Sequence, residues 1–435
     1  MNILLIVLDS VRAKNCSLYG HRRETTPELE ALAAEATVYD HARAPSNWTL
    51  PCHVSMFTGL ETHVHEVTVH HRLNPGHTVF EWLANEGYKT GLFTENGFLA
   101  SHEVGLKNAF ETVETIPENA HDRYLTGKIN DGPNGYYYAD RFLSWAEDRG
   151  KPWAACLNLM DGHRPFEPAP PYDHWGDQRA RRLQQELDLR WEPTFHGGDR
   201  PYWQLNGLES LYDGAIRQAD AIVGYVTEHL REQGMLEETL LVVCGDHGDG
   251  FGEDGYLPGE PPAVSHIVPM HESLLHVPLI VRHPGGNGGD RISKPAALTR
   301  FPTVVRAAID GGRASFVPEH LVVSTKLPVT ADLKRQFEAA SEAPEPLFAP
   351  SRAVYDTVGS VVRKRYHHGD AAGTLLTPSA NASVVDRIDR DSETLTHTAI
   401  DEVFNRFEPQ EVRSPRPDDE LQTETKEQLR ALGYY

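Results

Sequence analysis

The sequence predicts an α/β fold built around a mostly parallel sheet that helices cover on both faces. Short apolar runs typical of buried strands alternate with helical patterns through the first three hundred residues. Such alternation is typical of parallel strands joined by helical crossovers. Three of these runs lead into Asp9, Asp161 and Asp246. Because ligands bind outside the carboxyl ends of parallel strands, we expect these aspartates to lie at one edge of the sheet.

Five apolar runs are the expected strands. Each is rich in aliphatic or aromatic residues and short enough to cross a sheet once. The strands are expected at residues 1–8, 88–94, 153–160, 240–244 and 276–282.

Helical patterns fall between these runs. Thr26-Pro27 offers a cap and a first-turn proline to apolar residues at helical spacing. The segment Ser46–Gly59 ends in Thr-Gly, which is typical of a helix that closes. Helices are expected at residues 26–36, at the end of 46–59, and at 79–87, 137–146 and 208–233.

Two further segments depart from this alternation. The stretch 164–205 is rich in Pro, Trp, Arg and Glu and poorly periodic, and we expect a long loop or lid over the site. A transition near Asp310 divides a catalytic domain at 1–310 from a smaller C-terminal subdomain at 311–435. That subdomain is expected to hold a hairpin near 353–367 and a charged tail.

Composition excludes several classes of protein. The chain has 63 acidic and 41 basic residues and a formal charge of −22, which argues against a nucleic-acid or anionic-membrane partner. An adaptation to high salt and an ordinary acidic protein both fit this charge. No apolar stretch approaches the ~20 residues of a membrane span. No signal peptide precedes the first strand, so the sequence predicts a cytoplasmic protein without a membrane span.

The four cysteines are expected to be structural thiols. Cys16, Cys52, Cys156 and Cys244 are widely spaced and form no CxxC pair. Cys156 and Cys244 lie inside apolar runs, where free cysteine behaves as a small core residue. Disulfides and a zinc ribbon are therefore disfavoured.

The strongest chemical signal combines Thr49 with two strand ends. Thr49 lies beside Pro51 at the head of the expected helix, where free backbone N–H groups favour an anion. Asp9, Asp246 and His247 offer two carboxylates and an imidazole, a set that suits Mn²⁺, Zn²⁺, Mg²⁺ or Ca²⁺. Coordination of the Thr49 hydroxyl lowers its pKa, so that it can attack phosphorus or sulfur.

Two histidines are further candidates. His163 follows the strand at 153–160, and His266 precedes the one at 276–282. Either imidazole can hydrogen-bond the substrate oxygens or protonate a leaving group. Each candidate on its own also fits a structural role, such as a helix cap or a core histidine.

These segments, in this order, resemble the sulfatase-like branch of the alkaline phosphatase superfamily. The matching pieces are Asn2–Arg12, Tyr19-Gly-His, Thr26-Pro-Glu-Leu, Asn47–Gly59, Met160–Phe166, Leu211–Asp220, Gly245–Glu253, His276–Ile280 and the closing Leu429–Tyr435. The resemblance implies a three-layer α/β/α sandwich and hydrolysis or transfer of phosphate or sulfate esters. By motif position, Asp9, Asp246 and His247 hold the metal with Thr49 as nucleophile, while His163 and His266 contact the substrate.

Two departures from the family pattern refine this expectation. Sulfatases resembling this chain have Cys or Ser in a Cys-x-Pro-x-Arg pattern, which is converted to formylglycine. Here that register reads Thr49-Leu-Pro51-Cys52-His53, so the cysteine follows the proline. Ser10 stands where many relatives have Asp, which favours Mn²⁺ or Zn²⁺ over a carboxylate-rich calcium site.

We therefore expect a metal-dependent hydrolase of an anionic ester, with phosphoester or phosphodiester favoured and sulfate ester or phosphonate as the alternative. Two rivals stay open at this point. One is a metal-binding relative that has lost catalysis. The other is a two-metal phosphatase or mutase, with Asp161, His163 and His266 as the second set.

Overall fold

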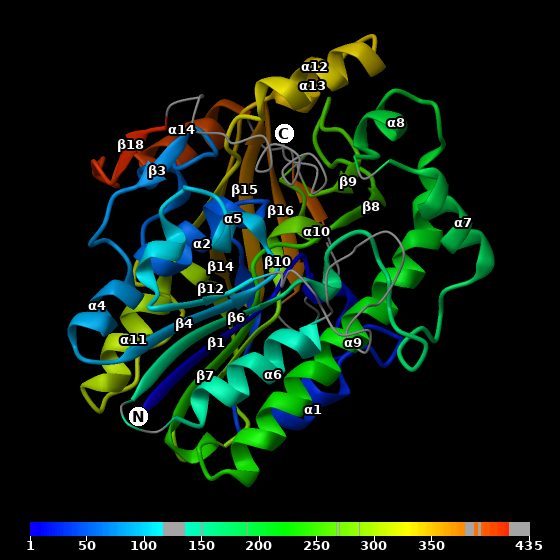
Figure 1. The fold of residues 1–435 in the computed structure, drawn as a ribbon. Helices are drawn as coiled ribbons and strands as arrows, with labels where there is room; N and C mark the ends of the chain where they lie inside the picture. Colours follow the sequence, from blue (N-terminus) through cyan, green and yellow to red (C-terminus); the bar gives the residue numbers. More distant parts are fainter. Residues whose placement is uncertain are drawn as a thin grey trace.

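A computed structural model gives the fold of the chain (Figure 1). It describes residues 1–115, 135–148, 150, 152–188, 190–266, 268, 270–286, 288–378, 387–389 and 393–416. The closing motif at 429–435 and the end of the expected charged tail lie outside the described residues.

A nine-stranded sheet forms the centre of the molecule. Its strands run in the order β10-β2-β11-β7-β1-β6-β4-β5, with β12 paired to β2. The strand β11 is antiparallel to β7 and β2, while β1, β4, β5, β6 and β7 are mutually parallel. The bounds are β1 Asn2–Leu8, β2 Thr37–Arg43, β4 Lys89–Thr94, β5 Thr112–Glu114, β6 Trp153–Leu159, β7 Thr239–Gly245, β10 His276–Val277, β11 Leu279–Arg282 and β12 Arg291–Ala297. The mostly parallel sheet is confirmed.

Helices cover both faces of this sheet, as Figure 1 shows. Successive side chains of a strand point to opposite faces, so Ile3, Leu5 and Val7 of β1 enter one core cluster while Leu4, Ile6 and Leu8 enter the other. The first face packs against α2 (Thr49–Thr58), α4 (Val79–Asn85), α5 (Gly97–Ala100) and α11 (Phe301–Ile309); the second packs against α1 (Pro27–Ala33), α6 (Gly135–Ala146) and α9 (Leu205–Glu232). The expected α/β/α sandwich is confirmed.

The stretch at 164–205 differs from the expected loop. It contains α7 (Gln178–Glu186), α8 (Glu192–His196) and a short 3₁₀ helix at Tyr202–Gln204. Asp177 caps α7 by accepting hydrogen bonds from the backbone of Arg179 and Ala180. The helix α7 was not expected because it is mostly polar and buries only Ala180, Leu183 and Gln184, whereas a lid role for the stretch stays a prediction.

A second, antiparallel sheet follows residue 320. It holds β13 (Val322–Thr325), β14 (Ser351–Val358), β15 (Val361–His368), β16 (Ala371–Pro378) and β17 (Arg387–Asp389), in that order. The expected hairpin is β14–β15, closed by a two-residue turn in which Gly359 has a φ of 60°. The smaller helices α12 (Ala331–Ala340), α13 (Glu345–Phe348) and α14 (Glu393–Phe404) accompany this sheet.

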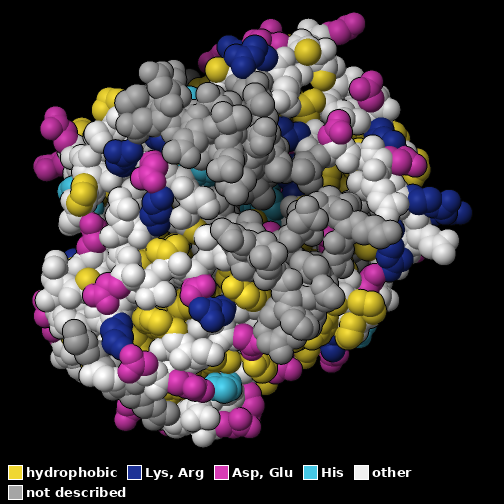
Figure 2. Space-filling view, in the orientation of Figure 1, with side chains coloured by type: hydrophobic (Ala, Val, Ile, Leu, Met, Phe, Trp, Pro, Cys, Tyr) yellow, Lys and Arg dark blue, Asp and Glu magenta, His cyan; other side chains and the backbone are white. Residues whose placement is uncertain are grey.

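The surface and the core have three further properties. Within the described ranges, no helix has both the length and the apolar character needed to cross a bilayer. Figure 2 shows Asp and Glu side chains spread over the visible face rather than gathered in one patch. All four cysteines are free and buried.

Candidate functional site

Asp9, Asp246 and His247 meet at the carboxyl edge of the central sheet. Asp9 follows β1 and Asp246 follows β7, and these strands are adjacent and parallel. One ligand atom from each of the three residues lies within 4.8 Å of the others, and all three side chains are buried. The sheet topology thus brings together residues that are more than two hundred positions apart in the chain.

The turn after β1 explains how Asp9 is aimed. Ser10 has a φ of 62°, a left-handed conformation that costs free energy for a residue other than glycine. Its backbone N–H donates to Asp246 Oδ1 at 3.0 Å, and its hydroxyl donates to Asp9 Oδ1 at 3.1 Å. Ser10 therefore joins the two carboxylates without adding a charge.

Two asparagines complete the surroundings of Asp9. Asn96 Nδ2 and Asn158 Nδ2 donate to Asp9 Oδ2 at 3.1 and 3.2 Å. Asn158 lies near the end of β6, and Asn96 follows β4, so both reach Asp9 from neighbouring parallel strands. Sequence reasoning missed them, although a polar residue at the end of a parallel strand was the available signal.

Thr49 is the first residue of α2 and is buried. Its Oγ1 lies 3.2 Å from His247 Nε2. The other ring nitrogen of His247, Nδ1, lies 2.9 Å from the carbonyl oxygen of Gly248. A carbonyl oxygen only accepts, so Nδ1 carries the proton and the Nε2 lone pair faces Thr49 and the carboxylates.

Of the two residues after Pro51, Cys52 lies in the core, while His53 Nδ1 lies 3.7 Å from Asp246 Oδ2. Cys52 Sγ lies 3.3 Å from the carbonyl oxygen of Ser46, in the core between α2 and the sheet. Burial raises the pKa of the Cys52 thiol well above its usual value. His53 Nδ1 donates to the carbonyl oxygen of Thr49 at 3.0 Å, and burial lowers the pKa of His53 to about 3. His53 is therefore a neutral group beside Asp246.

The two carboxylates favour a bound cation. Burial, followed by the nearby charge of Asp246, raises the pKa of Asp9 to about 8, and burial raises the pKa of Asp246 to about 7. Asp246 Oδ2 lies 3.4 Å from His247 Nε2 and has no hydrogen-bond partner. Buried carboxylates of like charge are costly unless a positive group compensates them. Two carboxylates, an imidazole lone pair and a hydroxyl fit a divalent cation.

His163 and His266 extend the cluster on one side. The ring centroid of His266 lies 4.8 Å from that of His247 and 5.2 Å from that of His163. His163 Nδ1 donates to the carbonyl oxygen of Arg164 at 2.6 Å. Burial lowers the pKa of both histidines, of His163 to about 3. Both rings are thus neutral and lie beside the metal-ligand candidates.

Asp161 takes a different direction from the other strand-end aspartates. Its Oδ1 accepts hydrogen bonds from Gln218 of α9 at 2.6 Å and from the backbone of Gly135 at 3.3 Å. Among the described residues, the Asp9 cluster is the one group of three or more His, Cys, Asp or Glu side chains close enough to share an ion. The structure therefore does not assemble a second metal set from Asp161, His163 and His266.

Comparisons with known proteins agree with this architecture. Residues 1–308 match the family model described as sulfatase. The chain belongs to the sulfatase family. Arylsulfatase K from Canis lupus familiaris is 20% identical over 378 residues, which are 76% of this chain and 66% of that protein. A multifunctional alkaline phosphatase superfamily protein from Trinickia caryophylli is 23% identical over 232 residues, 48% of this chain and 41% of that one.

This sulfatase-family chain covers 66% and 62% of the arylsulfatase K proteins of Canis lupus familiaris and Bos taurus, just under two thirds of their length. Among solved structures, the phosphonate monoester hydrolase of Agrobacterium radiobacter aligns with a TM-score of 0.63 at 16% identity, over 96% of this chain and 99% of that one. A 2-O GAG sulfatase aligns with a TM-score of 0.63 at 13% identity, over 100% and 94%. These likenesses show a shared fold.

Proposed function

We propose that this chain is a metal-dependent hydrolase of phosphate esters, diesters included, with Thr49 as its nucleophile. The observation that carries the proposal is the position of the Thr49 hydroxyl. It stands at the N-terminus of α2, 3.2 Å from His247 Nε2, within the cluster that Asp9 and Asp246 complete. Because a structural threonine needs no pair of buried carboxylates beside it, this arrangement supports an activated hydroxyl.

Asp9, Asp246, His247 and Thr49 would hold the cation, for which Mn²⁺ or Zn²⁺ fits this mixed oxygen and nitrogen set best. When bound, a divalent cation favours the ionised form of a hydroxyl and neutralises charge on a transferring group. The Nδ1–H of His247, fixed on Gly248, keeps the Nε2 lone pair directed at the site. The backbone N–H groups at the head of α2 favour the anionic group of the substrate.

The reaction proceeds in two displacements. Thr49 Oγ1 forms a bond to phosphorus as the bond to the leaving oxygen breaks, and a proton passes to that oxygen. Water then attacks the phosphorus of the threonine ester and restores the threonine hydroxyl, which releases phosphate from a monoester substrate and a phosphate monoester from a diester. His266 would hydrogen-bond a phosphoryl oxygen. His163, whose Nδ1 proton is held by the carbonyl oxygen of Arg164, would accept a proton at Nε2 and relay it to the leaving oxygen.

Thr49 is also the reason for favouring phosphate over sulfate. The cysteine of this motif lies in the core and not at the nucleophile position, so it offers no precursor of formylglycine. A similarity to a phosphonate monoester hydrolase supports phosphorus chemistry, whereas similarities to arylsulfatase K and iduronate 2-sulfatase support the sulfate ester alternative. A metal-binding relative without catalysis is disfavoured, because Thr49 and all three ligand candidates are present together.

The test compares Thr49→Ala with Thr58→Ala, a change at the other end of the same helix. Thr58 donates its hydroxyl to the carbonyl oxygen of Val54 and lies away from the cluster. We expect Thr49→Ala to lose at least a thousandfold in kcat with an unchanged circular dichroism spectrum. Thr58→Ala should keep turnover within about threefold. Full activity in Thr49→Ala would exclude Thr49 as the nucleophile.

A further inference from the structure

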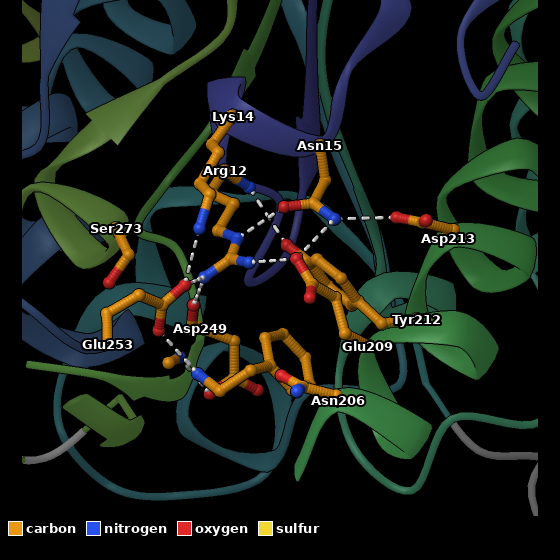
Figure 3. A network of polar contacts seen from close by, with 12 residues as sticks. Arg12, Lys14, Asn15, Asn206, Glu209, Tyr212, Asp213, Asp249, Glu253 and Ser273 are labelled. Carbon is orange, nitrogen blue, oxygen red and sulfur yellow. Dashed lines mark hydrogen bonds and ion pairs between the residues drawn. The ribbon is translucent and has the colours of Figure 1, made fainter. Parts of the chain in front are cut away.

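A fully buried arginine lies behind the metal-ligand cluster. Arg12 follows the Asp9–Ser10 turn, and Figure 3 shows its guanidinium at the centre of a network of polar side chains. Burying a cation is costly unless it is fully paired and hydrogen-bonded. The partners of Arg12 therefore indicate its structural role.

The guanidinium joins three separate elements. Its Nη1 donates to the backbone oxygen of Asp249 at 2.7 Å and to Glu253 Oε1 at 2.6 Å. Its Nη2 donates to Glu209 Oε1 of α9 at 2.7 Å, and Nε donates to Asn15 Oδ1 at 2.6 Å. The loop that begins at Asp246 and the helix α9 are thus attached to the segment that follows β1.

The backbone of the same segment is fixed by Tyr212. The Tyr212 hydroxyl donates to the carbonyl oxygen of Ser10 at 2.7 Å and accepts from the N–H of Arg12 at 3.0 Å. It therefore clamps both sides of the turn whose left-handed residue, Ser10, joins Asp9 to Asp246. A strained turn persists only when its surroundings hold it.

Two glycines allow the Asp9–Ser10 turn and the Asp246–Asp249 loop to approach each other closely. A Cβ on Gly248 would lie 2.7 Å from Arg12 Cβ and would overlap the backbone oxygen of Ser273. A Cβ on Gly245 would overlap the backbone oxygen of Val11. The Asp9–Ser10 turn and the Asp246–Asp249 loop are therefore in close contact, and Arg12 bonds them together.

We propose that Arg12 is a positioning residue for the cation site. It acts by holding the Asp9–Ser10 turn against the Asp246–Asp249 loop. The distance between the Asp9 carboxylate and the ligand atoms of Asp246 and His247 is thereby fixed. This inference rests on the proposed function, because it concerns the cation assigned there. The planar fork of arginine can bond all four acceptors at once, whereas a lysine amine is a single point with three donors.

The test measures Mn²⁺ affinity by the loss of the free-ion signal in electron paramagnetic resonance, with no substrate present. Arg12→Lys is compared with Arg282→Lys. Arg282 is equally buried and bonds Glu35, Glu237 and the backbone oxygen of Leu236, remote from the cluster. We expect both variants to lose thermal stability. Only Arg12→Lys should weaken Mn²⁺ binding, by at least tenfold, as partners behind metal ligands typically do.

A second pair of variants, with smaller changes, tests the proposal even if Arg12→Lys does not fold. Tyr212→Phe removes only the hydroxyl that clamps the turn, and Tyr19→Phe removes a hydroxyl that bridges the backbone of Tyr39 and Leu279. Tyr212→Phe should weaken Mn²⁺ binding at least threefold and Tyr19→Phe should leave it unchanged. Wild-type affinity in a folded Arg12→Lys, or in Tyr212→Phe, would overturn the positioning role alone. A wild-type protein that binds no Mn²⁺ would overturn the cation site itself.

Discussion

At the scale of single residues, the placement of Cys52 gives a sharp prediction. Its thiol is buried, bonds the backbone of Ser46 and lies in the core. We expect Cys52→Ala to keep turnover within about threefold while lowering stability by about 1 kcal/mol, since it deletes one small buried group. Rates and urea unfolding measured on the same preparation check this. A folded but inactive Cys52→Ala would show that the thiol, or a residue made from it, carries the chemistry.

The raised carboxylate pKa values predict how cation binding depends on pH. The pKa of Asp9 is raised to about 8 and that of Asp246 to about 7, so the cation-free folded protein holds protons that a cation must displace. Affinity for Mn²⁺ should rise from about pH 5 to about pH 8 and then level off. Over this window the folded chain binds more protons at these two groups than the unfolded chain, so their contribution to stability falls as pH rises.

Calorimetric titration in buffers of different ionisation enthalpy counts the protons released when Mn²⁺ binds. We expect a release near pH 6.5 that Asp9→Asn reduces. Binding with no proton release at that pH, in the wild type, would contradict the raised pKa values.

The cluster of Asp9, Asp246 and His247 was predictable, whereas the residues that hydrogen-bond it were not. Asp9, Asp246 and His247 follow apolar runs typical of buried strands, so the local sequence predicts that they lie at the same edge of the sheet. Asn96 and Asn158 act on Asp9 through strand neighbours fixed only by the order β1-β6-β4. That order depends on long-range packing, which no local pattern reports.

At the scale of elements, the close contact of two loops predicts a strong effect of one methyl group. Gly248→Ala places a Cβ against Arg12 and the backbone of Ser273, so the Asp246 loop must shift. We expect at least tenfold weaker Mn²⁺ binding and a stability loss of about 2 kcal/mol or more. Gly288→Ala is the control, because a Cβ there meets nothing within 4 Å. Equal behaviour of the two variants would contradict the tight packing of these loops.

Strands that are apolar along their whole length were predictable from the sequence, whereas strands with charged residues were not. Strands such as β1 and β7 are apolar throughout and were expected. The strand β2 was missed because it carries Asp40, His41 and Arg43, whose charges are met only in the fold, as when Arg43 pairs with Glu272. Long-range pairing hides such a strand from local patterns.

At the scale of the whole molecule, the charge of −22 predicts a dependence on salt. Excess negative charge destabilises a compact chain by self-repulsion, and the Debye length falls from ~10 Å at about 0.1 M salt to ~3 Å at about 1 M. We expect the melting temperature to rise between about 0.1 and 1 M KCl. Scanning calorimetry checks this, and a melting temperature that falls over the same range would contradict it.

The domain boundary near residue 310 and the cytoplasmic location stay predictions.

The central claim is that Thr49 carries out phosphoryl transfer. The most direct measurement is the initial rate of the Mn²⁺- or Zn²⁺-loaded protein on matched nitrophenyl sulfate, phosphate monoester and phosphodiester, beside Thr49→Ala. We expect a phosphate ester to be hydrolysed at least a hundredfold faster than the sulfate, and Thr49→Ala to abolish this activity. A preference for the sulfate, or turnover that survives Thr49→Ala, would contradict it.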